Sequence, residues 1–217
     1  MIPPGFPLSK TLHPDDLIVL ADYLSTVDRD FTRASPQHEL RRWEYALALA
    51  AFDQWWAEKP LPSAFPILDV GGSGSPFASM VDGFVHIIDP KETHRMDLQA
   101  YLRTAPRLSA AVFCLSVIEH VKDLDQFLYH LACLVAPGGL LVITTDCWNG
   151  EGEDAAHFHW MRERIFTPAS LYKFSSAVEG TLRAFGFDLF GGLDPTYHGD
   201  QLYGSYSFGS LVMRKRP

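Results

Sequence analysis

The sequence predicts an α/β fold: a doubly wound, mostly parallel sheet with an antiparallel late strand, preceded by N-terminal helices. Short continuous apolar runs recur along the chain, and three of the four stop at glycine or aspartate, which is typical of strands buried on both faces of a parallel sheet. An amphipathic segment lies between the last two runs, and alternating strands and helices imply parallel pairing with right-handed crossovers. The expected strands are residues 65–70, 84–88, 110–117 and 140–145, and the helix is residues 123–135.

Two helices are expected ahead of the sheet. The first spans about residues 14–26 and has a proline and two aspartates at its start, which favour a helix N-terminus. The second begins at Pro36 and ends near residue 59, before a proline-rich stretch that cannot continue a helix. We therefore expect a helical extension or lid over residues 1–62 and a cofactor-binding domain over residues 63–217.

The last third of the chain contains another helix and two late strands. Thr167 is the expected helix cap, Pro168 is the first helical residue, and Gly186 ends the helix. Residues 187–190 and 208–213 are apolar runs with no helical pattern between them, so we expect them to pair antiparallel.

Composition excludes some classes of partner. The 217 residues carry 18 Lys and Arg against 26 Asp and Glu, a formal net charge of −8. This balance disfavours nucleic acid as a substrate, because affinity for phosphates comes largely from clustered basic residues. No apolar run approaches the length of a membrane span, and the N-terminus lacks a secretory pattern, so we expect a cytoplasmic protein without membrane contact. The oligomeric state does not follow from the sequence.

A glycine-rich turn follows the first expected strand and contains Gly71, Gly72, Ser73 and Gly74. Small residues let a ligand approach the backbone, and the free amides at a helix start can bind a carboxylate or phosphate. Asp89 ends the next expected strand, where a carboxylate can accept hydrogen bonds from both ribose hydroxyls of an adenosine cofactor. The alternative is a tight turn followed by an acid that only caps a helix.

The dinucleotide fingerprint tests which adenosine cofactor binds. If Gly72 and Gly74 are its first two glycines, its third position is Phe77, whose ring should obstruct the close strand–helix packing that the fingerprint needs. An NAD-dependent oxidoreductase is therefore the second choice.

In its motifs the chain resembles the class I S-adenosylmethionine-dependent methyltransferases, particularly their small-molecule branch, whose fold is Rossmann-like. Five segments carry this resemblance in order and at matching spacing: residues 67–74, 86–89, 96–98, 115–121 and 134–142. It covers residues 65–146 closely, and the late helix and strands extend it to the C-terminus. The resemblance implies a methyltransferase domain with S-adenosylmethionine as cofactor and a small-molecule methyl acceptor.

The resemblance also implies site residues. Asp69 would orient the turn and the cofactor's amino group, with room for the methionine part provided by Gly71, Gly72 and Gly74, while Asp89 would bind the ribose. Adenine would be recognised by Asp97 and the Leu98 amide, and the pocket would be lined by Leu115 and Ser116. Ser73 departs from the family pattern because such loops usually carry a glycine there. The segment 41–45 looks like the helix that closes over the cofactor in some relatives, so Trp43 would cover the sulfonium or pack in the core.

Catalytic candidates follow the strand ends. Methyl transfer is mainly a matter of aligning donor and acceptor, but a hydroxyl acceptor also needs a base, for which histidine is well matched to neutral pH. We favour His159 in the insertion after the fourth expected strand, with His120 and Asp146 as further candidates. Asp146, His157 and His159 could instead ligate a metal, but two histidines on an irregular loop define no geometry, and we expect no metal. A non-catalytic cofactor-binding member of the fold remains a third alternative.

Overall fold

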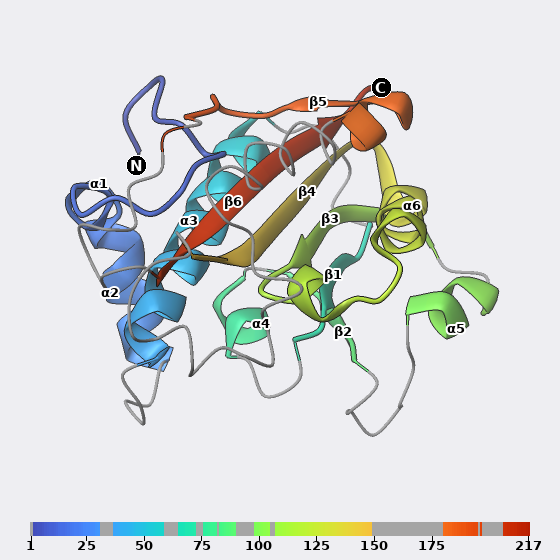
Figure 1. Cartoon of the computed structure of the whole chain (residues 1–217), viewed down its shortest axis with the longest axis horizontal. Coiled ribbons are helices and arrows are strands. Elements are labelled where there is room, and N and C mark those ends of the chain that lie inside the picture. The colour runs from blue at the N-terminus through green and yellow to red at the C-terminus, as the bar shows by residue number, and fades with distance from the viewer. Residues whose placement is uncertain are drawn as a thin grey trace.

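The structure, a computed structural model, describes residues 2–30, 37–58, 65–72, 76–81, 83–89, 98–104, 107–148, 180–194, 196 and 206–217. These residues form a six-stranded sheet with the order β2-β1-β3-β4-β6-β5 (Figure 1). The strands that pair in parallel are β1 (Ile67–Val70), β2 (Val85–Ile88), β3 (Ser109–Cys114) and β4 (Val135–Trp148). The late strands β5 (Phe187–Leu189) and β6 (Tyr206–Lys215) are antiparallel to each other, and β6 is antiparallel to β4. The predicted fold class and the antiparallel ending are confirmed.

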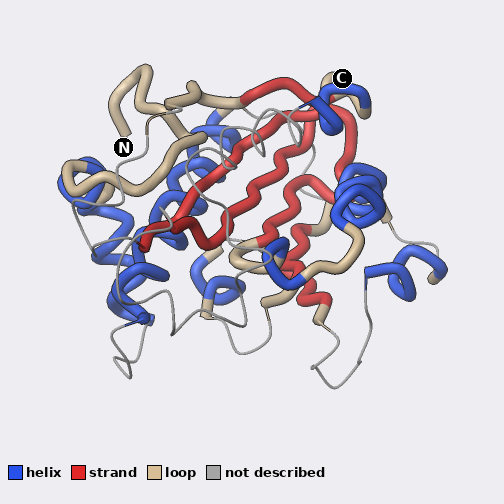
Figure 2. Tube along the Cα trace, viewed as in Figure 1, coloured by secondary structure: helices blue, strands red, loops and turns tan. Residues whose placement is uncertain are grey.

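Helices cover both faces of this sheet (Figure 2). The long helix α3 (Gln37–Ala57) and the N-terminal residues share one apolar core with alternate side chains of β3, β4 and β6. The opposite face packs against α5 (Leu98–Arg103) and α6 (Leu124–Leu134) through a second core. Asp123 caps α6 by accepting a hydrogen bond from the Gln126 amide at 3.0 Å, as expected for an aspartate at that position. The result is a three-layer α/β/α arrangement.

The helix predicted for residues 14–26 is wrong in its bounds, because two helices occupy this region. They are α1 (Asp16–Val19) and α2 (Ala21–Asp30), and Leu20 between them leaves the helical conformation with φ −92° and ψ 11°. Leu20 and Leu24 are both buried in the core. Tertiary burial has therefore overridden a continuous local helical pattern, which propensity alone cannot anticipate.

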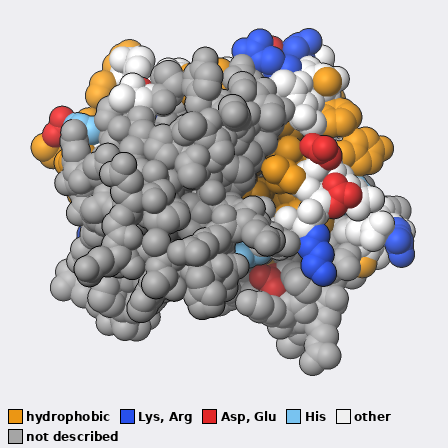
Figure 3. All heavy atoms as spheres, viewed as in Figure 1, with side chains coloured by type: hydrophobic (Ala, Val, Ile, Leu, Met, Phe, Trp, Pro, Cys, Tyr) orange, Lys and Arg blue, Asp and Glu red, His pale blue; other side chains and the backbone are white. Residues whose placement is uncertain are grey.

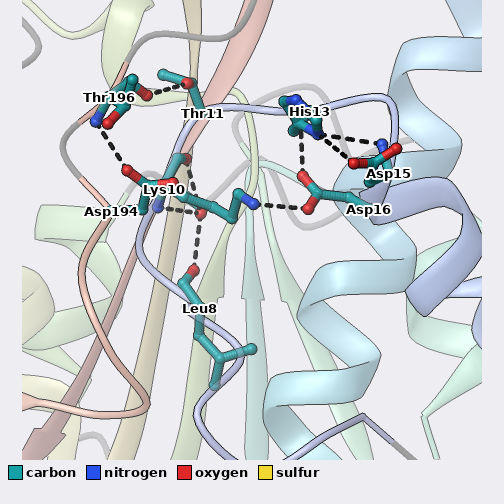
Figure 4. A network of polar contacts seen from close by, with 9 residues as sticks. Leu8, Lys10, Thr11, His13, Asp15, Asp16, Asp194 and Thr196 are labelled. Carbon is teal, nitrogen blue, oxygen red and sulfur yellow. Dashed lines mark hydrogen bonds and ion pairs between the residues drawn. The ribbon is translucent and has the colours of Figure 1, made fainter.

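Residues ahead of α1 lie along β6 as a strap. Ser9 and Thr11 form isolated bridges with Leu193 and Gly209. The Lys10 ammonium and the Asp16 carboxylate make a buried ion pair at 2.6 Å, with 6% and 3% of their side chains exposed (Figure 4). The N-terminal residues thus share hydrogen bonds and a core with the sheet, while the division at residue 62 into extension and domain stays a prediction.

Two strand predictions need correction. Burial of β2 on both faces is wrong: His86 and Ile87 are exposed, because β2 is the edge strand of the described sheet. The fourth strand is longer than residues 140–145, since β4 begins directly after α6 and pairs with β6 as far as Trp148. Its Pro137-Gly138-Gly139 sequence lies inside the strand at a register shift against β3, where Gly138 has φ +80°.

The helix predicted to begin at Thr167 and the residues between β2 and α5 fall largely outside the described residues. Residues 180–184 are helical, and Gly186 follows with φ +85°, as expected for a glycine that ends a helix. Thr167, Pro168 and residues 90–97 are not among the described residues.

No helix in the described ranges is long and apolar enough to span a membrane.

Candidate functional site

The candidate site lies where β1, β2 and β3 end together. Val70 pairs with Ile88, and Asp69 pairs with Phe113, so the residues that follow these strands emerge at one edge of the sheet. The Gly71 amide donates a hydrogen bond to the Ile88 carbonyl at 2.8 Å, which ties the glycine turn to the end of β2. The carboxyl ends of parallel strands are where open α/β sheets bind ligands.

Both described glycines of the turn lie where an added Cβ would meet a neighbouring side chain. Gly71 has φ +84°, and a Cβ added there would lie 2.3 Å from the Cγ2 atom of Val117. A Cβ on Gly72 would lie 2.1 Å from the Oδ2 atom of Asp69. The turn therefore packs against the segment after β3 on one side and under a carboxyl group on the other. Ser73 and Gly74 lie outside the described residues, so their expected roles stay predictions.

Asp69 is a buried acid with an unusual environment. Only 2% of the residue is exposed, and its Oδ2 atom has no hydrogen-bond partner among the described residues. Burial, with a smaller contribution from the nearby charges of Glu44 and Asp89, raises the pKa of Asp69 from 3.8 to about 7. A buried carboxyl with an unpaired oxygen can accept a hydrogen bond from a cationic ligand group, whose charge would lower this pKa again.

The other predicted cofactor contacts that are described lie near the same edge. Asp89 follows β2 and is 7% exposed, and Leu115 and Ser116 follow β3 and are buried. Leu98 is the buried first residue of α5, while Asp97 lies outside the described residues. The structure thus brings Asp69, Asp89 and Ser116 to neighbouring strand ends; their contacts with a cofactor remain predictions.

Trp43 is fully buried in the core that α3 shares with the sheet. This position agrees with the core-packing alternative, and the predicted cover over the sulfonium stays a prediction. The next residue on the helix, Glu44, instead reaches the ends of β3 and β4.

Glu44 is a site residue that the sequence reasoning missed. Its carboxylate is completely buried and accepts hydrogen bonds from the hydroxyl groups of Ser116, at 2.6 Å, and Thr144. Arg41, one turn earlier on α3, lies 3.3 Å from the other carboxylate oxygen. Burial raises the pKa of Glu44, although the Arg41 charge and the two hydroxyl groups act against this. The available signal was Glu44 itself, the single charged residue within the otherwise apolar residues 43–52 of α3.

Ser116 has a left-handed backbone, with φ +51°, the only such non-glycine residue in the described part of the chain. Its amide donates to the Thr144 hydroxyl at 3.0 Å, and that hydroxyl in turn donates to Glu44. Left-handed conformations of residues with a Cβ are strained and persist where surrounding contacts hold them, commonly at functional sites.

The catalytic candidates are only partly described. His120 is exposed at the end of the short helix η1 (Ile118–His120), and Asp146 is buried near the end of β4. His157 and His159 lie outside the described residues, so the favoured base and the metal alternative stay untested. Within the described residues no group of three or more metal-binding side chains is suited to hold an ion.

Glu119 is a second acid that the sequence reasoning passed over in favour of His120. It is 2% exposed, and its Oε2 atom accepts a hydrogen bond from the Thr145 hydroxyl at 3.2 Å. Burial raises the pKa of Glu119 to about 8, and the charge of Asp146 contributes in the same direction. The available signal in the sequence was its place directly after the apolar residues Val117 and Ile118.

The fold is that of the class I S-adenosylmethionine-dependent methyltransferases. The plantazolicin methyltransferase BamL, solved with a triazolic desmethylPZN analog and SAH, superposes with a TM-score of 0.56 and 10% identity over 92% of this chain and 99% of that one. The plantazolicin methyltransferase BpumL, solved with SAH, gives a TM-score of 0.51 and 10% identity over 93% of this chain and 98% of that one. The DszA carbon methyltransferase gives a TM-score of 0.51 and 15% identity over 94% of this chain and 60% of that one. No protein-family model and no curated protein sequence matches the chain.

Proposed function

We propose that this protein is an S-adenosylmethionine-dependent methyltransferase that transfers the methyl group to a small molecule, at a hydroxyl oxygen. The observation that carries the proposal is the meeting of the left-handed Gly71 turn, the buried Asp69 carboxyl and the buried Asp89 at adjacent strand ends. The plantazolicin methyltransferases of the same fold were solved with SAH, which supports this choice of cofactor.

The described residues fit such a cofactor. The unpaired Oδ2 of Asp69 can accept a hydrogen bond from the ammonium group of its methionine part, and Asp89 can accept from the ribose hydroxyls. The cofactor supplies a methyl group activated by a sulfonium. The protein has to align the acceptor, exclude water and take up the acceptor's proton, for which His159, His120 and Asp146 remain the candidates.

The NAD alternative is disfavoured by the packing of Phe77, the first residue of α4 (Phe77–Met80). Its ring is fully buried and meets the Phe113 ring edge-on, with centroids 4.8 Å apart. Phe77 therefore fills the space between α4 and the sheet, where the dinucleotide fingerprint needs close backbone contact.

We also propose that the protein is cytoplasmic and that its methyl acceptor is a small molecule rather than nucleic acid. On the face shown in Figure 3, the basic side chains of the described residues form separate small groups rather than a continuous band. The formal net charge of −8 supports a partner other than nucleic acid, because nucleic-acid affinity depends on clustered cations.

Calorimetric titration with S-adenosylmethionine, SAH and NADH tests the cofactor. We expect S-adenosylmethionine and SAH (S-adenosylhomocysteine) to bind and NADH not to bind. Asp89→Ala should weaken SAH binding at least tenfold, which corresponds to about the free energy of a lost hydrogen bond to a charged group. The exposed Asp125→Ala is the control and should bind as the wild type does. Binding of NADH alone, or unchanged SAH affinity in Asp89→Ala, would overturn the assignment. Methyl transfer to a panel of alcohols and phenols then separates an enzyme from a non-catalytic binding protein.

A further inference from the structure

We propose that Glu44 is a positioning residue for the cofactor site: its buried carboxylate holds Ser116 in the left-handed conformation and thereby sets the shape of the glycine turn. This inference rests on the proposed function, because it concerns binding of the cofactor. It assigns a role in the site to helix α3, within the region expected to be an extension or lid.

Ser116, Thr144 and Glu44 are joined by a closed ring of hydrogen bonds that fixes the conformation of Ser116. The Ser116 hydroxyl donates to Glu44 at 2.6 Å, the Ser116 amide donates to the Thr144 hydroxyl at 3.0 Å, and the Thr144 hydroxyl donates to the same Glu44 oxygen. All three residues are buried. The carboxylate therefore directs the Ser116 hydroxyl directly, whereas the Ser116 amide is held by the Thr144 hydroxyl and also by the Thr144 carbonyl, at 3.3 Å.

Ser116 needs such a hold because its conformation is unfavourable by itself. A residue with a Cβ avoids φ near +51°, where the side chain crowds the following carbonyl. Without the carboxylate, the hydroxyl groups of Ser116 and Thr144 would lose their shared acceptor in a buried place. The backbone after β3 would then relax toward an ordinary conformation.

The conformation of Ser116 is transmitted to the glycine turn through the next residue. Val117 packs closely on Gly71: a Cβ added to Gly71 would lie 2.3 Å from the Cγ2 atom of Val117. A change at Ser116 would move Val117 against this turn. Glu44 is thus linked to the turn by packing, through Ser116 and Val117, without itself being assigned a contact with the cofactor.

The test is calorimetric titration of SAH into the full-length protein and its variants. Glu44→Ala should weaken SAH binding at least tenfold, which is the scale of the free-energy cost of holding a residue with a Cβ in the left-handed conformation. Glu44→Gln keeps an oxygen that accepts from both hydroxyl groups and should stay within about threefold of the wild type. The matched control is Glu58→Gln, an exposed glutamate just after the same helix, which should bind SAH as the wild type does.

A second background separates positioning from direct contact. Glycine adopts positive φ without strain, so in a Ser116→Gly protein Glu44→Ala should weaken SAH binding less than threefold beyond Ser116→Gly itself. An undiminished loss there, or wild-type affinity in folded Glu44→Ala, would overturn the proposal. If Glu44→Ala does not fold, Ser116→Ala takes its place, because it removes the hydroxyl group that donates to Glu44 and keeps the Cβ. An SAH affinity of Ser116→Ala equal to that of Ser116→Gly would contradict the proposal that this hydrogen bond stabilises the left-handed conformation. Failure of the wild type and Glu58→Gln to bind SAH would instead refute the proposed function.

Discussion

Replacing Asp69 by asparagine should change how the stability of the protein depends on pH. Burial raises the pKa of Asp69 from 3.8 to about 7, so the folded protein keeps a proton that the unfolded chain releases over this range. Unfolding then releases a proton, and the free energy of unfolding falls as the pH rises from about 4 to about 7. Below that window this carboxyl has no effect on stability, and above it the destabilisation is complete.

The gap between 3.8 and about 7 corresponds to about 4 kcal/mol, of which about 3 kcal/mol develops between pH 5 and pH 8. Asp69→Asn cannot ionise, so its free energy of unfolding relative to the wild type should rise by about 3 kcal/mol over this interval. Urea unfolding at pH 5, 6, 7 and 8, followed by circular dichroism, measures the difference.

The exposed Asp125→Asn is the matched control, and its difference from the wild type should stay constant with pH. Parallel pH profiles for Asp69→Asn and the wild type would refute the reasoning that this carboxyl is held mostly protonated by burial.

Three further substitutions test the glycine turn, a buried ion pair and a buried hydrogen bond, each by urea unfolding. Gly71→Ala combines a left-handed backbone, φ +84°, with a Cβ placed against Val117, and should destabilise by roughly 2–4 kcal/mol; a loss below roughly 0.5 kcal/mol would contradict the geometry. Lys10→Met leaves the Asp16 carboxylate buried without its cation and should destabilise by about 3–5 kcal/mol, whereas Lys10→Met/Asp16→Asn should recover most of this; equal losses would argue against a buried ion pair. Trp55→Phe removes a buried hydrogen bond of 2.9 Å to the Gly138 carbonyl and should cost about 1–3 kcal/mol, so an unchanged midpoint would show that water replaces the indole.

Much of the fold follows from local patterns. Three of the four parallel strands could be read from short apolar runs that stop at a glycine or aspartate, β3 from the apolar run 110–117 alone, and α6 from its apolar stripe and Asp123 cap. The order of the glycine turn and Asp89 along the chain also placed two site elements at neighbouring strand ends, because parallel strands end on the same edge.

Other features depend on residues far apart in the sequence. The break at Leu20, the length of β4 and the exposure of β2 depend on which neighbours cover each segment, and those neighbours are distant in the chain.

The candidate site divides in the same way. The turn at Gly71 and the acid at Asp89 are visible in the sequence, because backbone conformation and strand order impose local residue choices. Glu44 is separated from Ser116 by 72 positions and from Thr144 by 100. A buried carboxylate needs partners that only the packing of α3 on the strand ends can supply, so its place in the site was decided by the tertiary structure.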